Sequence, residues 1–97
     1  MPSAAPTPAT FPGFLEVWAN ENKLLAFDGR VLELFGWADA HRLHLSQHPR
    51  LEFYEEGRRK ILKMRVVSDR QTFIYDYDLA RRPDLERLDA ALRAARP

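Results

Sequence analysis

The 97 residues are enough for one hydrophobic core and too few for two domains. The chain has 15 lysine and arginine residues against 14 aspartate and glutamate residues, so its formal charge of +1 does not by itself predict a polyanionic partner. The absence of cysteine excludes a disulfide scaffold, a zinc site with cysteine ligands and a thiol nucleophile.

The first 13 residues, MPSAAPTPATFPG, contain four prolines mixed with alanine, serine and threonine. This composition is poor in residues that build a core and predicts a disordered tail. The segment has neither the basic start nor the apolar run of a secretory signal, and no apolar run in the chain approaches the roughly 20 residues of a membrane span. We therefore expect a cytoplasmic protein whose single folded domain covers residues 14–96.

From residue 14 onward, short apolar segments alternate with turn residues, a pattern typical of an antiparallel β domain. The pattern predicts seven strands followed by one helix. The strands are expected near residues 14–19, 23–28, 30–36, 42–46, 50–56, 59–67 and 71–77, and the helix at residues 83–95. The expected fold is mainly β, an antiparallel bent sheet or partly open barrel capped by the C-terminal helix.

Turn residues predict the first two hairpins. The loop Asn20–Asn22 fits a three-residue connection, which places Val17 opposite Leu25. The pair Asp28-Gly29 fits a two-residue turn, because such a turn favours residues that tolerate a positive φ, and it places Leu25 opposite Leu32. The apolar side chains of these three strands then share one face, which we expect to be the core face.

The last two hairpins follow from the same reasoning. A two-residue turn at Glu56-Gly57 places Leu51 opposite Leu62. A turn at Asp69-Arg70 aligns apolar and aromatic residues on the predicted core face, in the pairs Met64–Tyr75, Val66–Phe73 and Leu62–Tyr77. Phe73, Tyr75 and Tyr77 are therefore expected in the core rather than on a base-stacking surface.

The segment RPDLERLDAALRAARP carries the signals of a helix start and a helix end. Pro83 suits the first helical position, Asp84 and Glu86 complement the N-terminal end of the dipole, and Arg93 and Arg96 complement its C-terminal end. The apolar residues recur at spacings of three and four, at Leu85, Leu88, Leu92 and Ala95. A helix this short needs tertiary contacts, so we expect this stripe to dock on the open end of the sheet.

Seven short antiparallel strands followed by one amphipathic helix resemble the pleckstrin-homology superfold, in particular its small bacterial PH-like members. The resemblance covers residues 14–96 and rests on the order of the elements, on the hairpin LLAFDGRVLEL and on the strand TFIYDYDL that leads into the helix. It implies two sheets packed nearly at right angles, with the helix filling one open corner. It also implies binding of a protein, a peptide or an anionic lipid rather than catalysis.

Lipid-binding members of that superfold carry a basic cluster across the first two strands and their loop. In this chain the loop is Asn20–Asn22, with Lys23 as the adjoining cation and Glu16 nearby. The tryptophan common in the helix of the family is also absent, and leucine takes its place. The usual route to a lipid head group is therefore not predicted.

The strongest local charge lies on the strand predicted at residues 59–67 and on its two flanking turns. Residues 58–70 contain six cations and one acid, Asp69. A surface for an acidic or phosphorylated partner is one interpretation. The residues that would form it are Arg58, Arg59, Lys60, Lys63, Arg65 and Arg70.

The other interpretation is that acids on the neighbouring strands neutralise this basic strand. The predicted registers place Lys63 opposite Asp76 and Glu52 opposite Ile61. They also place Tyr54 opposite Arg59, where the cation can lie on the ring. Arg58, Arg59, Arg65 and Arg70 would remain without a partner.

Three histidines, His41, His44 and His48, are spaced by three and four residues. On a helix these spacings would align them as metal ligands, whereas on the predicted strand His41 lies on the face opposite His44. No carboxylate adjoins them in the sequence to orient the rings. A metal site is therefore the outside hypothesis, and no metal or other cofactor is predicted.

The chain has no glycine-rich phosphate loop and no nucleophile elbow. Asp76 and Asp78 share a strand face, but the nearby cations favour the ionised form of both, unlike an acid–base pair. We therefore predict a non-enzymatic module that binds a protein or peptide, either on a strand edge or through Arg58, Arg59, Lys63, Arg65 and Arg70. An anionic lipid or nucleic acid on the same cations is the alternative. Trp18 and Trp37 are left open between core and interface, and the sequence does not decide the oligomeric state.

Overall fold

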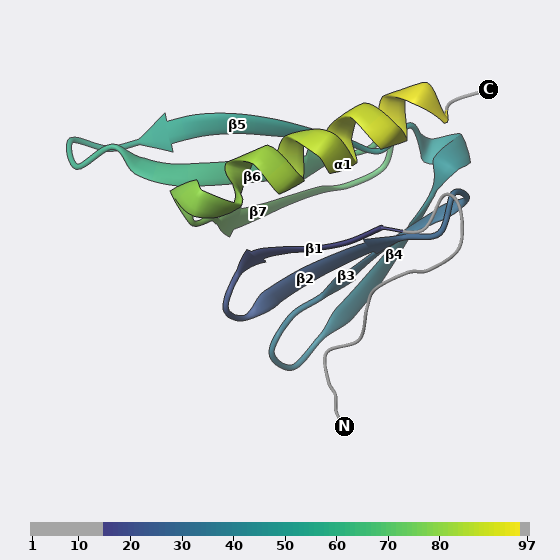
Figure 1. Ribbon diagram of the computed structural model, residues 1–97, viewed down its shortest axis with the longest axis horizontal. Helices are drawn as coiled ribbons and strands as arrows, with labels where there is room; N and C mark the ends of the chain where they lie inside the picture. The colour runs from purple at the N-terminus through teal and green to yellow at the C-terminus, as the bar shows by residue number, and fades with distance from the viewer. Residues whose placement is uncertain (1–14, 96–97) are drawn as a thin grey trace.

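The computed structural model describes residues 15–95, so the tail predicted at residues 1–13 lies outside the described residues, as do residues 14 and 96 of the predicted domain. Seven strands followed by one α-helix confirm the mainly β fold expected from the sequence (Figure 1). Two short 3-10 helices, η1 and η2, precede β5 and α1. The elements are β1 (Leu15–Asn20), β2 (Lys23–Phe27), β3 (Val31–Phe35), β4 (Ala40–His44), η1 (Leu45–Gln47), β5 (Arg50–Glu56), β6 (Ile61–Val67), β7 (Thr72–Asp76), η2 (Leu79–Arg81) and α1 (Arg82–Ala94).

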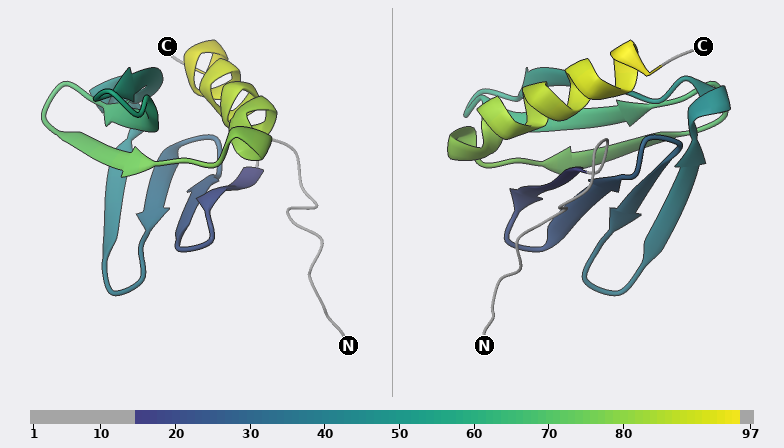
Figure 2. Two further views of the ribbon diagram at one scale, coloured as in Figure 1. Left: turned by 90° about the vertical axis from the view of Figure 1, so that its left-hand side faces the viewer. Right: turned by 45° about the vertical axis from the view of Figure 1, so that its right-hand side comes forward.

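The strands form two antiparallel sheets. Sheet A has the order β1-β2-β3-β4, and sheet B has the order β5-β6-β7. Within each sheet, strands that are consecutive in the sequence pair with one another, so both sheets are simple meanders. The two sheets remain separate and do not close into a barrel. The 3-10 helix η1 connects them at the corner between β4 and β5 (Figure 2).

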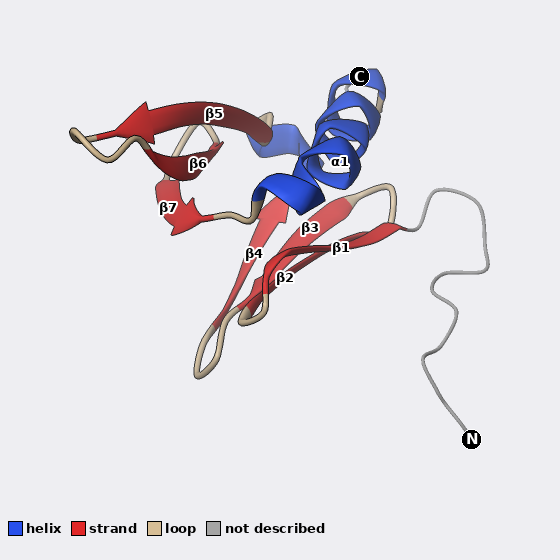
Figure 3. Ribbon diagram, turned by 60° about the vertical axis from the view of Figure 1, so that its left-hand side comes forward, coloured by secondary structure: helices blue, strands red, loops and turns tan. Residues whose placement is uncertain are grey.

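Helix α1 also spans the two sheets. It contacts β1, an edge strand of sheet A, and β5, an edge strand of sheet B (Figure 3). The end of β7 is also joined to β1, because the Asp78 N–H donates to the Ala19 carbonyl at 2.9 Å. The side-chain amide of Asn20 donates to the Asp76 carbonyl at 2.7 Å. These contacts hold the two sheets together where they share no ladder.

The core lies between the two sheets and the helix. Leu85, Leu88 and Leu92 are fully buried, which confirms the apolar stripe predicted for the helix. Each contributes about 1.5–3 kcal/mol through the apolar surface it removes from water. The sheets supply the other buried side chains: Val17, Ala19, Leu25, Phe27, Leu32, Leu34, Leu43, Leu51, Met64, Val66 and Tyr77.

The aromatic residues of β7 and its C-terminal extension face this core, as predicted. Tyr77 is buried, and Phe73 and Tyr75 are partly buried against the core. Burial raises the pKa of the Tyr75 phenol. The Tyr77 ring meets the edge of Phe53, and its hydroxyl accepts a hydrogen bond from Arg82 at 2.8 Å. None of the three is a free base-stacking surface.

Two of the four predicted registers are confirmed. In sheet A, Val17 lies opposite Leu25, with an irregularity between Trp18 and Asn20 that shortens the turn to Glu21 and Asn22. In sheet B, the β6–β7 pairing is the one predicted from the Asp69-Arg70 turn. It includes Met64 opposite Tyr75 and Val66 opposite Phe73.

The β2–β3 register differs from the prediction, because Leu25 lies opposite Leu34 instead of Leu32. The carboxylate of Asp28 accepts the backbone N–H groups of Arg30 and Val31, each at 2.8 Å. This Asx-type arrangement moves the turn by one residue, to a centre at Gly29 (φ 97°) and Arg30. The register therefore shifts by two residues, and the core face is unchanged.

The β5–β6 register also differs, because Leu51 lies opposite Val66 instead of Leu62. The turn has four residues, 57–60, rather than the predicted two. Gly57 (φ 76°) supplies a positive φ as glycine commonly does, but Lys60 (φ 53°) also adopts the left-handed region, which no local sequence signal indicates. The register shifts by four residues, so the core face is again preserved.

The Asp28 turn gives a pH-dependent prediction. The N–H groups of Val31 and Arg30 that donate to the carboxylate lower the pKa of Asp28 below its usual 3.8. This stabilisation is present above the pKa of the unfolded chain and is lost as the pH falls through the lowered value. We expect the difference in unfolding free energy between the wild type and Asp28→Asn to be constant above about pH 5 and to change below it. Urea denaturation of both proteins at a series of pH values above and below about 5 measures this difference. A difference in unfolding free energy that stays constant over the whole series would contradict the prediction.

None of the helices within residues 15–95 combines the length and the apolar character needed to cross a bilayer.

Candidate interaction surfaces

The predicted basic strand is β6, and Lys63 at its centre is neutralised by its neighbours. Its ammonium lies 2.6 Å from the carboxylate of Asp76, directly across the ladder, as the sequence predicted. Glu56 lies 3.7 Å away on the other side. The hydrogen bond to Asp76 raises the pKa of Lys63 above its usual 10.5. Lys63 and Asp76 therefore form an ion pair between neighbouring strands.

Arg65 is held in the same way, by partners that the sequence assigned elsewhere. Glu52 lies opposite Arg65 and not opposite Ile61, with 3.5 Å between carboxylate and guanidinium. Tyr54 lies opposite Lys63 and not opposite Arg59, and its ring centroid is 4.4 Å from the Arg65 guanidinium. The corrected β5–β6 register accounts for both changes. Arg65 is thus near a carboxylate and an aromatic ring, but its pairing is looser than that of Lys63: Glu52 also lies 3.6 Å from Arg50, and the buried Arg65 Nε makes no hydrogen bond within residues 15–95.

The remaining predicted cations lie at opposite ends of β6. Arg58 and Arg59 are exposed in the 57–60 turn together with Lys60, and none of these three side chains has an ion-pair partner within residues 15–95. Arg70 lies in the turn after the strand. The seven residues of β6 separate the two ends by roughly 20 Å. Of the five residues predicted as one site, Arg58 and Arg59 therefore lie at one end of β6 and Arg70 at the other, with Lys63 and Arg65 paired to carboxylates between them.

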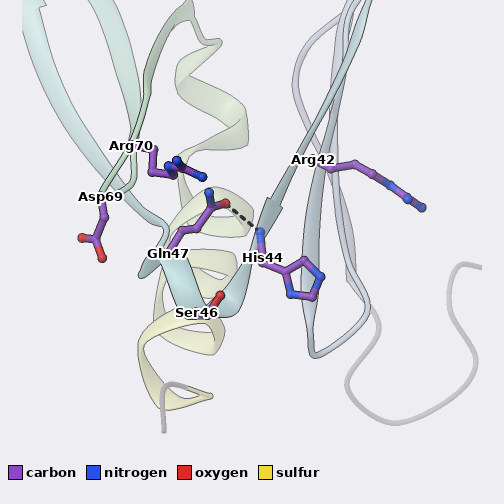
Figure 4. A pocket seen from close by; sticks show the side chains of 6 residues that line it. All are labelled: Arg42, His44, Ser46, Gln47, Asp69 and Arg70. Carbon is purple, nitrogen blue, oxygen red and sulfur yellow. Dashed lines mark hydrogen bonds between the residues drawn. The ribbon is translucent and has the colours of Figure 1, made fainter.

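Arg70 borders a recess of about 500 Å³ at the corner between the sheets. The side chains around it do not converge on a common point, as Figure 4 shows. Arg42 extends away from the recess, and its guanidinium pairs with Glu33 at 2.8 Å. Asp69 also points away (Figure 4), and it bonds to His48 instead. The other lining residues are His44, Ser46 and Gln47.

The three histidines lie in different environments. His41 is partly buried with its ring 4.5 Å from that of Phe73, whereas His44 is exposed on the other face of β4. β4 ends at His44, two residues before the end of the predicted strand, because η1 begins at Leu45. His48 follows η1, and its Nδ1 lies 2.7 Å from an Asp69 oxygen. No group of three or more possible ligand side chains that could hold a metal ion occurs within the described part of the chain.

A row of apolar side chains crosses the outer face of sheet A. Trp18 lies opposite Leu24, and Leu24 lies opposite Phe35, so the three side chains are cross-strand neighbours on β1, β2 and β3. They alternate with the buried residues of the same strands and so point away from the core. Trp18 is 45% exposed and Phe35 37% exposed.

The turn between β3 and β4 adds Trp37 to this row. Trp37 is 87% exposed, the most exposed large apolar residue among those described. Gly36 allows the tight turn: its N–H donates to the Asp39 carbonyl at 2.8 Å, and a Cβ there would collide with the Asp39 carboxylate and the Lys23 ammonium. A groove of about 280 Å³ runs along these residues. We call it the aromatic groove; it is lined by Trp18, Glu21, Asn22, Leu24, Phe35, Gly36 and Trp37.

The sequence left Trp18 and Trp37 undecided and did not identify the groove. Alternation within β1, β2 and β3 does place Trp18, Leu24 and Phe35 on one face, and this signal was available. The predicted β2–β3 register, however, places Leu24 opposite Glu33 instead of Phe35. The two-residue shift at the Asp28 turn is what completes the row.

Comparison of the chain with models of protein families, with curated protein sequences and with solved structures found no match.

Proposed function

We propose that this domain is a non-enzymatic interaction module that binds a protein or peptide partner on the aromatic groove. The observation that carries the proposal is the contiguous outer-face row of Trp18, Leu24 and Phe35, in which both aromatic residues are exposed, with the exposed Trp37 beside it. Aromatic side chains are enriched among the residues that dominate binding energy at protein interfaces. Such residues on the outer face of a sheet contribute little to the core, so binding is the function that fits them best.

The arrangement of the elements supports the resemblance to the pleckstrin-homology superfold. A four-stranded sheet, a three-stranded sheet and a C-terminal helix follow one another in the chain. The helix lies against an edge strand of each sheet. In that superfold many members act as adaptors that bind peptides or protein surfaces, and we extend this role, with a cytoplasmic location, to the present chain.

The proposal is tested by capture from cell extract on the immobilised full-length chain, with the retained proteins quantified for three versions of it. We expect at least one protein to bind the wild type and to fall at least ~10-fold with Trp37→Ala, as for a central interface residue. Trp37 is 87% exposed, so its replacement leaves the core intact.

Ile74→Ala is the matched control for this capture. Ile74 is 55% exposed and lies on the outer face of sheet B, away from the groove. A partner of the groove is retained equally by this variant and the wild type. Identical sets of retained proteins on all three versions would refute the groove as the docking surface.

A second candidate is the binding of an anionic ligand by the 57–60 turn. Arg58, Arg59 and Lys60 are consecutive, exposed and unpaired within residues 15–95. They project at the tip of the β5–β6 hairpin (Figure 1). A compact cluster of three cations is enough for weak, salt-dependent binding of a polyanion.

Retention on a heparin column tests this second candidate. We expect Arg58→Ala/Arg59→Ala to elute at clearly lower salt than the wild type, because two phosphate- or sulfate-binding charges are lost. Arg87→Ala/Arg93→Ala removes two cations from the exposed side of α1 and is the control for net charge. Equal shifts for the two variants would show that only the total charge matters.

A further inference from the structure

The aromatic groove is surrounded by carboxylates. Glu21 lines it from the β1–β2 turn, and Asp39 lies beside Gly36 in the β3–β4 turn. Glu16 and Glu33 flank Ala26 in the adjacent row of the same sheet face. Glu16, Glu21 and Glu33 therefore border the apolar row, whereas the Asp39 carboxylate lies on the other face of the sheet, 3.5 Å from His41.

The cations of this region are directed elsewhere or already paired. Lys23 alternates with Leu24, and its ammonium lies beside Gly36 and the Asp39 carboxylate, 5.0 Å from the ring centroid of Tyr75 in sheet B. Arg42 is bonded to Glu33 at 2.8 Å. Glu16 and Glu21 have no ion pair within residues 15–95. The surroundings of the groove are thus net acidic, although the whole chain has a formal charge of +1.

These charges select among the possible occupants of the groove. An acidic or phosphorylated partner would meet like charges at Glu21 and Glu16. A second copy that docked with the same face would place these acids against their own equivalents. A small molecule is poorly matched, because about 280 Å³ lies below the usual ~300–1,000 Å³ of ligand sites and the groove is open. A basic partner meets none of these penalties.

We propose that the aromatic groove binds an extended peptide segment in which apolar residues are flanked by arginine or lysine. The apolar side chains pack between Trp18, Phe35 and Trp37. A guanidinium or ammonium group stacks on the exposed Trp37 ring and pairs with Glu21, which lines the groove. This inference rests on the proposed function and adds the chemistry of the partner.

The chain provides its own optical probe for the test. Its two tryptophans, Trp18 and Trp37, both line the groove, so all tryptophan emission reports on this site. The probes are three fluorescein-labelled dodecapeptides: one alternates leucine with arginine, one replaces arginine by glutamate, and one replaces leucine by serine. Anisotropy of the label gives affinity, and emission of unlabelled mixtures shows whether the groove is occupied.

We expect the leucine–arginine peptide to bind saturably with a change in tryptophan emission. Both other peptides should bind at least ~10-fold more weakly, one because its charges are repelled and one because it lacks apolar anchors. Trp37→Ala should weaken the leucine–arginine peptide by at least ~10-fold. Glu21→Gln/Glu16→Gln should weaken it by ~3–10-fold and make the affinity less sensitive to salt.

Two variants control for general effects. Glu55→Gln removes one carboxylate from an exposed position of β5, far along the chain from the groove, and Ile74→Ala removes an exposed apolar side chain from sheet B. Both should bind the leucine–arginine peptide as the wild type does. Their agreement with the wild type would tie the losses to the groove.

Several results would overturn the proposal. Equal binding of the leucine–glutamate peptide refutes the requirement for a basic partner, while a loss with Trp37→Ala in the same series leaves the groove as the docking surface. Self-association that buries Trp37, seen by sedimentation at the same concentration, assigns the groove to a second copy. If no peptide binds but capture from extract depends on Trp37, the partner chemistry is wrong and the proposed function stands; if neither depends on Trp37, both fail.

Discussion

Replacing Leu88 with alanine is expected to destabilise the protein by about 2–5 kcal/mol, the range for large-to-small changes at fully buried positions. Leu88 is fully buried on α1, the helix that lies against β1 and β5. Its truncation removes apolar contacts and leaves a cavity. The two sheets cannot move in to fill this cavity without breaking their hydrogen-bond ladders. In a urea titration the midpoint should fall while the slope stays the same, since the surface exposed on unfolding hardly changes.

Leu79→Ala is the matched control for this experiment. Leu79 lies in η2, next to the start of α1, but it is 66% exposed. Its truncation should cost less than about 0.5 kcal/mol, as for most surface substitutions. If Leu88→Ala is no less stable than Leu79→Ala, α1 does not cover the core, and the packing of the two sheets described here is wrong.

The elements of the fold were predictable because each depends on a local pattern. The alternation of apolar residues predicted the seven strands, and the spacing of Leu85, Leu88 and Leu92 predicted the buried face of the helix. Turns were less predictable. The Asp28 turn is moved by two side-chain hydrogen bonds, and the 57–60 turn relies on a left-handed lysine, Lys60. Propensity rules carry no clear signal for either feature.

The errors in the predicted turns changed which residues pair across the strands, but not the sheet face on which each side chain lies. A register shift by an even number of residues keeps every side chain on its own face, so the predicted core survived errors of two residues in sheet A and four in sheet B. Surface contacts depend on the individual partner instead. Lys63 and Asp76 were paired correctly because the β6–β7 register was right, whereas Glu52 and Arg65 were not paired because the β5–β6 register was wrong.

The same reasoning explains why charge was a poor guide to the site. The six cations of residues 58–70 are conspicuous in the sequence, yet Lys63 and Arg65 meet carboxylates that come from two other strands. The aromatic groove is assembled from three strands and a turn, and its members are 19 residues apart from Trp18 to Trp37. Its recognition requires the β2–β3 register, which the sequence did not provide.

Replacing Asp89 with alanine is expected to cost about 1.5–3 kcal/mol, as for loss of a charged partner from a buried donor. One carboxylate oxygen of Asp89 accepts the backbone N–H of Leu51 at 2.9 Å, and the other pairs with Arg93 at 2.8 Å. The Leu51 N–H points to the free edge of β5, where sheet B has no further strand. Asp89 therefore takes the place of a ladder partner and joins α1 to the sheet. Urea denaturation measures the loss.

Asp84→Ala and Arg93→Ala separate this hydrogen bond from the ion pair. Asp84 is on the same helix and pairs with Arg87 at 2.9 Å on the surface, so its loss should cost at most about 1 kcal/mol. Arg93→Ala removes the ion pair of Asp89 but leaves the Asp89 carboxylate in place as acceptor for the Leu51 N–H. Amide hydrogen exchange at Leu51 gives the direct readout: it should accelerate in Asp89→Ala and remain slow in the other two variants. Slow exchange in all three would mean that the helix covers this edge by apolar packing alone.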